Sequence, residues 1–260
     1  MKLPVVPSKE LGQHFLVDEN IQGVIGRHAQ LAPEDVVLEV GPGLGVLTAF
    51  LASRVALVHA VEIDPALEPH LRERLEGLAN VRLRFGDALR LDLASLGPPP
   101  AKLVSNLPYN VAAPIVVESL EGLPSVELWC VMVQREVGER FFAGPGTKAY
   151  GAVSVLVQLA CRRTGSHPVS RTVFTPRPRV DSLLLAFRRR PLPAGFARVR
   201  AVVVGAFAHR RKTLPNSLEL AGVAARKEAA LALAALGRLP STRAEALSPE
   251  EFVALAEALG

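Results

Sequence analysis

Residues 36–45 read VVLEVGPGLG, an apolar run that passes directly into a glycine-rich turn. The run predicts a short buried strand, and residues 44–52 have the spacing of a helix. Gly41, Gly43 and Gly45 have the pattern G-x-G-x-G, which lacks the third glycine position of the dinucleotide form. Because glycines at such a turn let a ligand approach backbone N–H groups closely, the stretch favours a nucleotide-like cofactor over a simple tight turn.

Strands and helices alternate on both sides of this stretch. Further strands are predicted at 55–61, 81–85, 102–105 and 126–133, and helices at 19–30, 65–75, 111–120 and 134–142. Asp18 is placed to cap the first helix. Alternation of this kind predicts a parallel, doubly wound α/β sheet. Residues 150–161 and 182–188 are expected to be two strands without a helix between them, so that an antiparallel pair closes the sheet.

A linker rich in proline and glycine, residues 190–195, ends this pattern. The segments after it are rich in alanine and leucine and have helical periodicity, at 196–208, 213–221, 226–236 and 249–258. The sequence therefore predicts a large domain over residues 1–190 and a small all-helical domain over 194–260.

Two carboxylates follow neighbouring strands. Glu62 ends the second strand, 21 residues after Gly41, and Asp87 follows the strand at 81–85. Ligands of open α/β sheets bind outside the carboxyl ends of the strands, so both groups should face one crevice. An acidic side chain at the position of Glu62 can accept hydrogen bonds from both hydroxyls of a ribose. NAD and S-adenosylmethionine both carry an adenosine, and the loop does not separate them.

The segment NLPYN at 106–110 follows the fourth strand, which is predicted to end at Ser105. It could be only a turn, because Asn and Pro favour turns. Pro108 has no N–H and biases Leu107 toward an extended conformation, so that the Leu107 carbonyl points out of the sheet. For Asn110 we predict only a cap on the next helix.

An amino nitrogen fits this segment. The Asn106 amide oxygen and the Leu107 carbonyl are two acceptors for the two donors of an exocyclic amine, and Tyr109 offers a face for a planar base. Acceptors that hold the amine hydrogens out of the ring plane localise the nitrogen lone pair toward a methyl donor. No general base is needed before attack, because the proton can leave after the nitrogen becomes cationic.

The charge of the 260 residues is unevenly distributed. The net charge of +5 combines −5 over residues 1–159 with +10 over 160–260, and residues 162–212 hold 13 basic side chains against one acidic, Asp181. This concentration predicts a polyanionic partner. The arginine-rich usage of a high-GC genome is the alternative, but phenylalanines interspersed among the arginines favour nucleic acid, namely Phe174, Phe187 and Phe207.

Other classes of protein are disfavoured. Cys130 and Cys161 lie in apolar segments 31 residues apart, which suits buried thiols and neither a metal site nor a disulfide framework. The sequence has no apolar run of the length that a membrane span requires, and its first residues lack the apolar core of a secretory signal. We expect a soluble cytoplasmic protein.

Taken in order, the motifs resemble those of the bacterial small-subunit ribosomal RNA adenine-N6 dimethyltransferase family, whose loss gives kasugamycin resistance. The resemblance covers nearly all of the chain. It rests on LGQHFL at 11–16, EVGPGLGVLT at 39–48, VEID at 61–64, GDAL at 86–89, NLPYN at 106–110, QREVGER at 134–140, YGAVSVLVQ at 150–158, FTPRPRVDS at 174–182 and FAHRRKTLPNSL at 207–218.

The resemblance implies a Rossmann-like class I S-adenosylmethionine-dependent methyltransferase fold with a small all-helical C-terminal domain. Residues 1–190 would then bind the cofactor, and residues 194–260 would contact rRNA. The implied cofactor-binding residues are His14, Leu16, Gly41, Gly43, Gly45, Glu62, Ile63, Asp87, Ala88 and Asn106.

It also implies that Tyr109 and Phe174 sandwich a target base that has left any stacked arrangement. The implied catalytic set is Asn106, Leu107, Pro108, Tyr109 and Phe174, and the implied RNA-binding set is Arg177, Arg179, Arg210, Arg211 and Lys212. The implied substrate is a pair of adjacent adenosines in the hairpin loop near the 3′ end of 16S rRNA in the 30S subunit, each methylated twice. Neither a metal ion nor an oligomer is expected.

Two positions depart from the family pattern. His14 stands where Asn is common; both side chains can hydrogen-bond, so we expect cofactor binding to survive and do not interpret His14 as a base. Ser8-Lys9-Glu10 is less basic than usual, which weakens the expected RNA contact of the N-terminal arm.

Three other functions compete with this interpretation. The 23S rRNA methyltransferases of macrolide resistance share the cofactor loop, but Tyr109 and the segment 209–218 favour the small-subunit enzyme. A ribosome-assembly or transcription factor without turnover would not need an intact NLPY, Glu62 and Asp87. A dehydrogenase would leave NLPYN and the basic half of the chain without a role.

Overall fold

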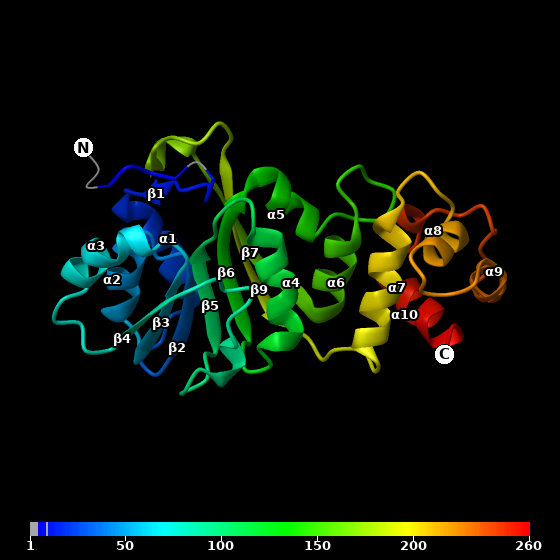
Figure 1. Ribbon diagram of the computed structural model, residues 1–260, viewed down its shortest axis with the longest axis horizontal. Coiled ribbons are helices and arrows are strands. Elements are labelled where there is room, and N and C mark those ends of the chain that lie inside the picture. Colours follow the sequence, from blue (N-terminus) through cyan, green and yellow to red (C-terminus); the bar gives the residue numbers. More distant parts are fainter. Residues whose placement is uncertain (1–4, 9) are drawn as a thin grey trace. The chain divides into compact units, whose positions relative to one another are not determined.

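The computed structural model of the chain describes residues 5–8 and 10–260 (Figure 1). Lys9, on which the expectation for the N-terminal arm partly rests, lies outside the described residues. The chain forms two compact units. Unit 1 comprises the chain up to Gly138 together with Arg162–Arg189, and unit 2 comprises Glu139–Cys161 and Arg190–Gly260. The chain passes between the units three times. The predicted linker coincides with the third passage, after Arg189, whereas the first two, after Gly138 and after Cys161, were not predicted.

Unit 1 is built around a seven-stranded sheet with the order β4-β3-β2-β5-β6-β9-β7. Its strands are β2 (Val36–Val40), β3 (Leu57–Glu62), β4 (Val81–Phe85), β5 (Lys102–Asn106), β6 (Leu128–Gln134), β7 (Cys161–Val169) and β9 (Ser182–Arg189). The five strands from β4 to β6 are parallel, and β9 pairs antiparallel with β6. Two short strands, β1 (Phe15–Leu16) and β8 (Phe174–Thr175), form a separate antiparallel pair.

Helices alternate with the parallel strands over most of unit 1 (Figure 1). They are α1 (Glu19–Ala29), α2 (Val46–Ala52), α3 (Glu68–Arg74), α4 (Ala112–Gly122) and α5 (Arg135–Phe141), with short 3-10 turns at Pro65–Leu67, Leu93–Ser95 and Arg171–Val173. Of these helices, α2, α3 and α4 connect successive strands, α1 precedes β2 and α5 follows β6, while β4 and β5 are joined by a loop with a short 3-10 turn. Asp18 caps α1, because its side chain accepts hydrogen bonds from the backbone N–H groups of Asn20 and Ile21. This confirms the predicted start of the first helix.

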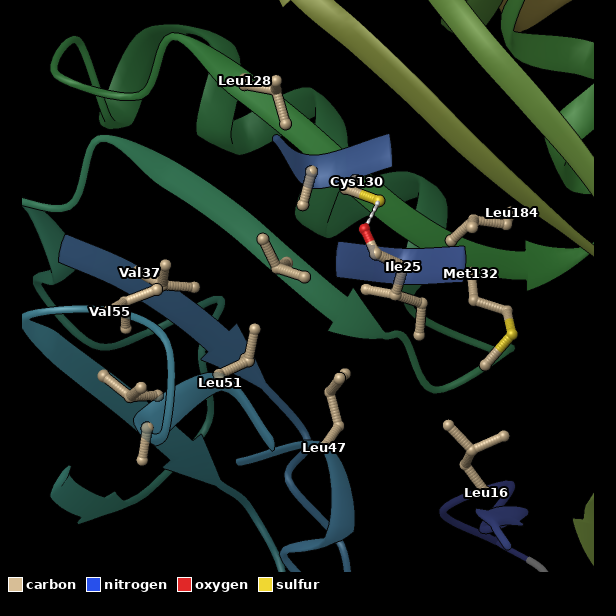
Figure 2. Close-up of a cluster of buried hydrophobic side chains, with 14 of the residues drawn as sticks. Leu16, Ile25, Val37, Leu47, Leu51, Val55, Leu128, Cys130, Met132 and Leu184 are labelled. Atoms are coloured by element: carbon tan, nitrogen blue, oxygen red, sulfur yellow. Dashed lines mark hydrogen bonds between the residues drawn. The ribbon is translucent and has the colours of Figure 1, made fainter. Parts of the chain in front are cut away.

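Helices α1 and α2 pack on one side of this sheet. Figure 2 shows Ile25 of α1 and Leu47 and Leu51 of α2 among side chains from the strands. The thiol of Cys130 lies 3.7 Å from the Ile25 carbonyl oxygen, and both cysteines are buried, as predicted. Nearly all residues of the strands from β2 to β6 are buried, except in the edge strand β4. The pairing of these strands fixes their register, so the positions at which they end are fixed relative to one another.

The predicted strand at 150–161 is wrong, because residues Ala152–Ala160 form helix α6 of unit 2. Buried residues occur on nearly every side of this helix, at Ser154, Val155, Leu156, Val157 and Ala160. A helix that is apolar all round shows no helical stripe in its sequence, and its valines favour a strand on propensity alone. The sheet is nevertheless closed by an antiparallel strand, β9, with β7 as its neighbour at the edge.

Unit 2 is helical, as predicted for the C-terminal region. It contains α6, α7 (Phe196–Ala208), α8 (Leu214–Leu220), α9 (Arg226–Ala235), α10 (Pro249–Ala258) and a 3-10 turn at Ala244–Ala246. The rings of Tyr150 and Phe252 both pack against Phe207, and the Tyr150 hydroxyl donates to the Leu247 carbonyl at 2.8 Å. Throughout the described chain, the helices are too short or too polar to cross a membrane.

Candidate active site

A cavity lies at the carboxyl ends of β2, β3 and β5, within unit 1. Parallel strands bring their following loops to the same edge of the sheet, which is why these segments meet. The walls are the glycine loop, the end of β3, the NLPYN segment and the N-terminal strap, which we define as residues 11–16. Of the predicted cofactor-binding residues, those that line the cavity are His14, Leu16, Gly41, Gly43, Glu62, Ile63 and Asn106.

The glycine loop requires glycine for two physical reasons. Gly41, Gly43 and Gly45 have φ values of 76°, 59° and 74°, in the left-handed region that side chains disfavour. A Cβ on Gly43 would lie 2.9 Å from Cδ1 of Phe15, and one on Gly41 would lie 3.1 Å from Cγ of Pro108. The loop is therefore a bare backbone surface against the cavity. Gly45 begins α2 and does not line it.

Glu62 is 4% exposed and is fixed by three backbone donors. Gly43 N–H donates to its Oε2 at 3.1 Å, and the N–H groups of Ile63 and Asp64 donate to its Oε1 at 2.9 Å. Burial raises the pKa of this carboxyl, and the backbone hydrogen bonds oppose that rise. The Glu62 carboxylate thus joins the glycine loop to the end of β3 and has further acceptor capacity at the cavity.

Asp87 and Ala88 lie outside the cavity walls. They follow β4, next to β3 in the sheet, and Gly86 N–H donates to the Glu62 carbonyl at 2.8 Å. The Asp87 carboxylate accepts from Leu89 N–H at 2.9 Å and lies 3.4 Å from Nε of Arg90. The structure therefore places Asp87 beside the cavity-lining Glu62, at the same sheet edge.

Glu39 is a cavity residue that the sequence reasoning missed. It lies on β2, is 1% exposed and lines the cavity, and its Oε2 has no hydrogen-bond partner among the described residues. The pKa of this carboxyl is raised from 4.5 to about 8, mainly by burial and also by the nearby Glu62, while the side chain of Thr48 opposes the rise. The signal was available, because Glu39 is the one charged residue in the apolar run VVLEV.

Glu39 predicts a pH dependence of folding stability. Its pKa is raised in the folded protein, so the folded state keeps a proton that the unfolded state loses between about pH 4.5 and about pH 8. The free energy of unfolding should therefore fall as pH rises through this window, and Glu39→Gln should remove that part of the fall. Urea denaturation of both proteins at several pH values checks this; a difference in stability that does not change with pH would contradict it.

The NLPYN segment carries a buried acceptor atom, without a partner among the described residues, on a residue that lines the cavity. Asn106 Nδ2 donates to the His14 carbonyl at 3.1 Å, and its Oδ1 is buried without a partner among the residues that the structure describes. Leu107 N–H donates to the Met132 carbonyl at 3.0 Å, which fixes the peptide that follows β5. A buried acceptor without a partner costs free energy, so a donor from a ligand would be favoured here.

Tyr109 is half-buried at the cavity wall. Its hydroxyl lies 2.6 Å from Oγ of Ser182, and its ring centroid lies 5.3 Å from that of His14. Burial raises the pKa of this phenol, so that the ring remains neutral. Nδ1 of His14 donates to the Pro176 carbonyl at 2.7 Å, so the strap contacts both the NLPYN segment and the loop after β8.

Phe174 is placed differently from its predicted role. It is 2% exposed, pairs with Leu16 across the β1–β8 pair, and belongs to the core cluster with Leu16 and Ile25. It does not line the cavity. The predicted sandwich of a target base between Tyr109 and Phe174 is not formed in this conformation, because the Phe174 ring packs within the core.

The role predicted for Asn110 is wrong. The N-cap residue of α4 is Val111, and no side chain caps it. Asn110 Nδ2 instead donates to the Glu10 carbonyl at 3.2 Å, next to the strap. Gln13 is a second strap contact that the sequence reasoning missed: its Nε2 donates to Oδ2 of Asp64 at 2.7 Å. These contacts join residues 51 or more positions apart, which no local pattern reveals.

The five basic residues predicted to bind RNA are all exposed. Arg177 and Arg179 lie in the loop before β9, in unit 1, and Arg210, Arg211 and Lys212 lie between α7 and α8, in unit 2. Residues 5–8 and 10–260 contain no cluster of three His, Cys, Asp or Glu side chains that could hold a metal ion.

Comparison with known proteins gives consistent matches. Residues 7–259 match the family described as ribosomal RNA adenine dimethylase. The chain is 51% identical to the ribosomal RNA small subunit methyltransferase A of Rubrobacter xylanophilus, covering 96% of this chain and 94% of that protein. It is 47% identical to the protein of the same name from Thermobifida fusca, covering 98% and 91%.

Two solved structures resemble the chain over nearly its whole length. The 23S rRNA methyltransferase ErmE is 30% identical, with a TM-score of 0.66, covering 94% of this chain and 99% of that one. A dimethyladenosine transferase from Plasmodium falciparum is 24% identical, with a TM-score of 0.78, covering 93% and 96%. These likenesses confirm the predicted class I methyltransferase fold.

Proposed function

Because the chain belongs to the ribosomal RNA adenine dimethylase family, we propose that it methylates 16S rRNA within the 30S subunit. It is an enzyme that dimethylates adenine at N6, with S-adenosylmethionine as the methyl donor. In this proposal the targets are two adjacent adenosines in the 3′-terminal hairpin loop, and the modification is part of small-subunit maturation. The observation that carries the proposal is the buried, unpartnered Oδ1 of Asn106 at the cavity.

The residues that line the cavity have the chemistry that S-adenosylmethionine requires. The glycine loop offers bare backbone, Glu62 has acceptor capacity beside it, and two side-chain oxygens of wall residues, Glu39 Oε2 and Asn106 Oδ1, lack partners among the described residues. Glu62 would hold the ribose hydroxyls, Asp87 would bind the adenine, and the strap residues His14 and Leu16 would cover the ligand. When bound, S-adenosylmethionine supplies an electrophilic methyl group.

The residues of the NLPYN segment would prepare the nucleophile. The Asn106 oxygen and the Leu107 carbonyl accept the two N6 hydrogens of adenine and so localise the nitrogen lone pair. Tyr109 stacks on the base and holds it at the cavity wall. After the first transfer one N6 hydrogen remains, which a single acceptor can hold. The proton released at each transfer passes to water, so no side chain must act as a base.

Exposed basic residues would hold the rRNA backbone. Arg177 and Arg179 lie on the loop that the strap contacts through Pro176, so phosphate contacts there would bring RNA to the cavity. Arg210, Arg211 and Lys212 would provide contacts from unit 2. Because phosphate contacts release counterions, binding to 30S subunits should weaken steeply with salt.

The resemblance to ErmE makes 23S rRNA the main alternative substrate. The higher identity to small-subunit enzymes, 51% against 30%, favours 16S rRNA. Methyl transfer should be measured in parallel on undermethylated 30S subunits and on protein-free 23S rRNA. We expect dimethyladenosine in 16S rRNA from the first reaction and only background methylation in the second. Activity confined to 23S rRNA would overturn the proposal.

A further inference from the structure

The Tyr109 hydroxyl contacts a serine that lies on another strand. Ser182 is the first residue of β9 and is fully buried, and its Oγ lies 2.6 Å from the phenol oxygen. Ser182 pairs in register with Gln134 of β6. The hydrogen-bonded pairing of β6 and β9 therefore fixes the backbone from which this hydroxyl extends.

The turn that enters β9 is also held. The backbone carbonyl of Asp181 accepts from Arg135 N–H at 3.0 Å, and its Oδ1 accepts from Arg171 N–H at 3.0 Å. These contacts tie the residue before Ser182 to the start of α5 and to the turn before β8. Ser182 is thus a fixed point, whereas Tyr109 lies in a loop.

The Tyr109 side chain pivots about its Cα–Cβ bond, and the phenol oxygen is the side-chain atom farthest from that pivot. A hydrogen bond at this oxygen therefore restrains the tilt of the ring more than a contact near the pivot would. Tyr109 has a second contact, to the tilted ring of His14, which belongs to the strap. Of these two contacts, only the one to Ser182 is made by a strand of the seven-stranded sheet.

We propose that Ser182 is a positioning residue, whose buried hydroxyl fixes the position of the Tyr109 ring on which the target adenine stacks. This inference rests on the proposed function. It assigns the last residue of FTPRPRVDS a role in methyl transfer that acts through Tyr109 and does not involve contact with the base or the cofactor.

A double-mutant cycle tests the proposal. Ser182→Ala leaves a half-buried phenol hydroxyl without its partner, and kcat/KM for 30S subunits should fall about tenfold, in line with the cost of an unpaired polar group. Tyr109→Phe removes the other half of the same bond and should cost a similar factor. In the double variant both groups are apolar, so its kcat/KM should be no lower than that of either single variant.

Two readouts separate positioning from general destabilisation. S-adenosylmethionine affinity, measured by calorimetry, should be unchanged in all three variants. Ser119→Ala is the matched control, because Ser119 is a buried serine that accepts a hydrogen bond from the Trp129 side chain at 2.8 Å and lies outside the cavity walls. It should lower the melting temperature and leave kcat/KM at the wild-type value.

The outcomes are distinct. Losses that multiply in the double variant, or wild-type kcat/KM in Ser182→Ala, would overturn the positioning role. If Ser182→Ala does not fold, Tyr109→Phe alone decides: an unchanged kcat/KM overturns the role, and a loss with intact cofactor affinity supports it. A wild-type protein that binds S-adenosylmethionine but leaves 30S subunits unmethylated would contradict the proposed function itself, and with it this role for Ser182.

Discussion

Asn106→Ala is expected to lower kcat for methyl transfer by about 10²- to 10³-fold, the usual cost of removing one preorganised polar group from a reacting centre. The Oδ1 atom is buried and unpartnered, so a substrate amine gains a hydrogen bond there without displacing another group. The effect should appear in kcat, because the acceptor matters most as the nitrogen becomes cationic. Single-turnover assays on 30S subunits with saturating cofactor measure it.

Asn110→Ala is the comparison within the same segment. Asn110 carries the same amide, but its Nδ2 donates to the Glu10 carbonyl. Its loss should therefore cost less than about tenfold in kcat, in the range of one neutral hydrogen bond. Wild-type turnover by Asn106→Ala, or equal losses in both variants, would show that the acceptor mechanism is wrong.

Gly43→Ala is expected to weaken S-adenosylmethionine binding by about 10- to 100-fold, which corresponds to about 1.4–2.8 kcal/mol. Gly43 has a φ of 59°, and an added Cβ would lie 2.9 Å from Cδ1 of Phe15. Relief of that contact must shift either the strap or the loop. A shifted loop would also displace the N–H that donates to Glu62.

Gly77→Ala controls for backbone strain alone. Gly77 has a φ of 79°, but an added Cβ would have no heavy atom within 4 Å, and the residue does not line the cavity. Both variants should lose about 1–2 kcal/mol of stability to the left-handed conformation. Only Gly43→Ala should lose cofactor affinity in calorimetry; equal affinities in the two variants would contradict the assignment of the cofactor loop.

The sequence predicted those parts of the site that lie next to strand ends. Gly41, Glu62 and Asn106 each follow or end a buried strand, and parallel pairing brings such positions together regardless of the intervening chain. The helices of unit 2 were predicted for a similar reason, because helical periodicity is a local signal. These features depend on spacing within one segment or on a general rule of the fold.

The features that were missed depend on tertiary contacts. The contact between Gln13 and Asp64 and the burial of Phe174 arise from the path of the strap, which local sequence does not specify. Helix α6 was predicted as a strand because burial on all sides erases its stripe. Glu39 is an exception, because its charge within the apolar run VVLEV was a local signal that was not used.

The modification state of 16S rRNA tests the central claim most directly. rRNA should be isolated from a strain that lacks this protein and from the same strain complemented with it, and the nucleosides of the 3′-terminal hairpin should be identified by mass spectrometry. We expect two adjacent unmethylated adenosines in the first sample and two N6,N6-dimethyladenosines in the second. Dimethylated adenosines at both positions without the protein would contradict the proposed function.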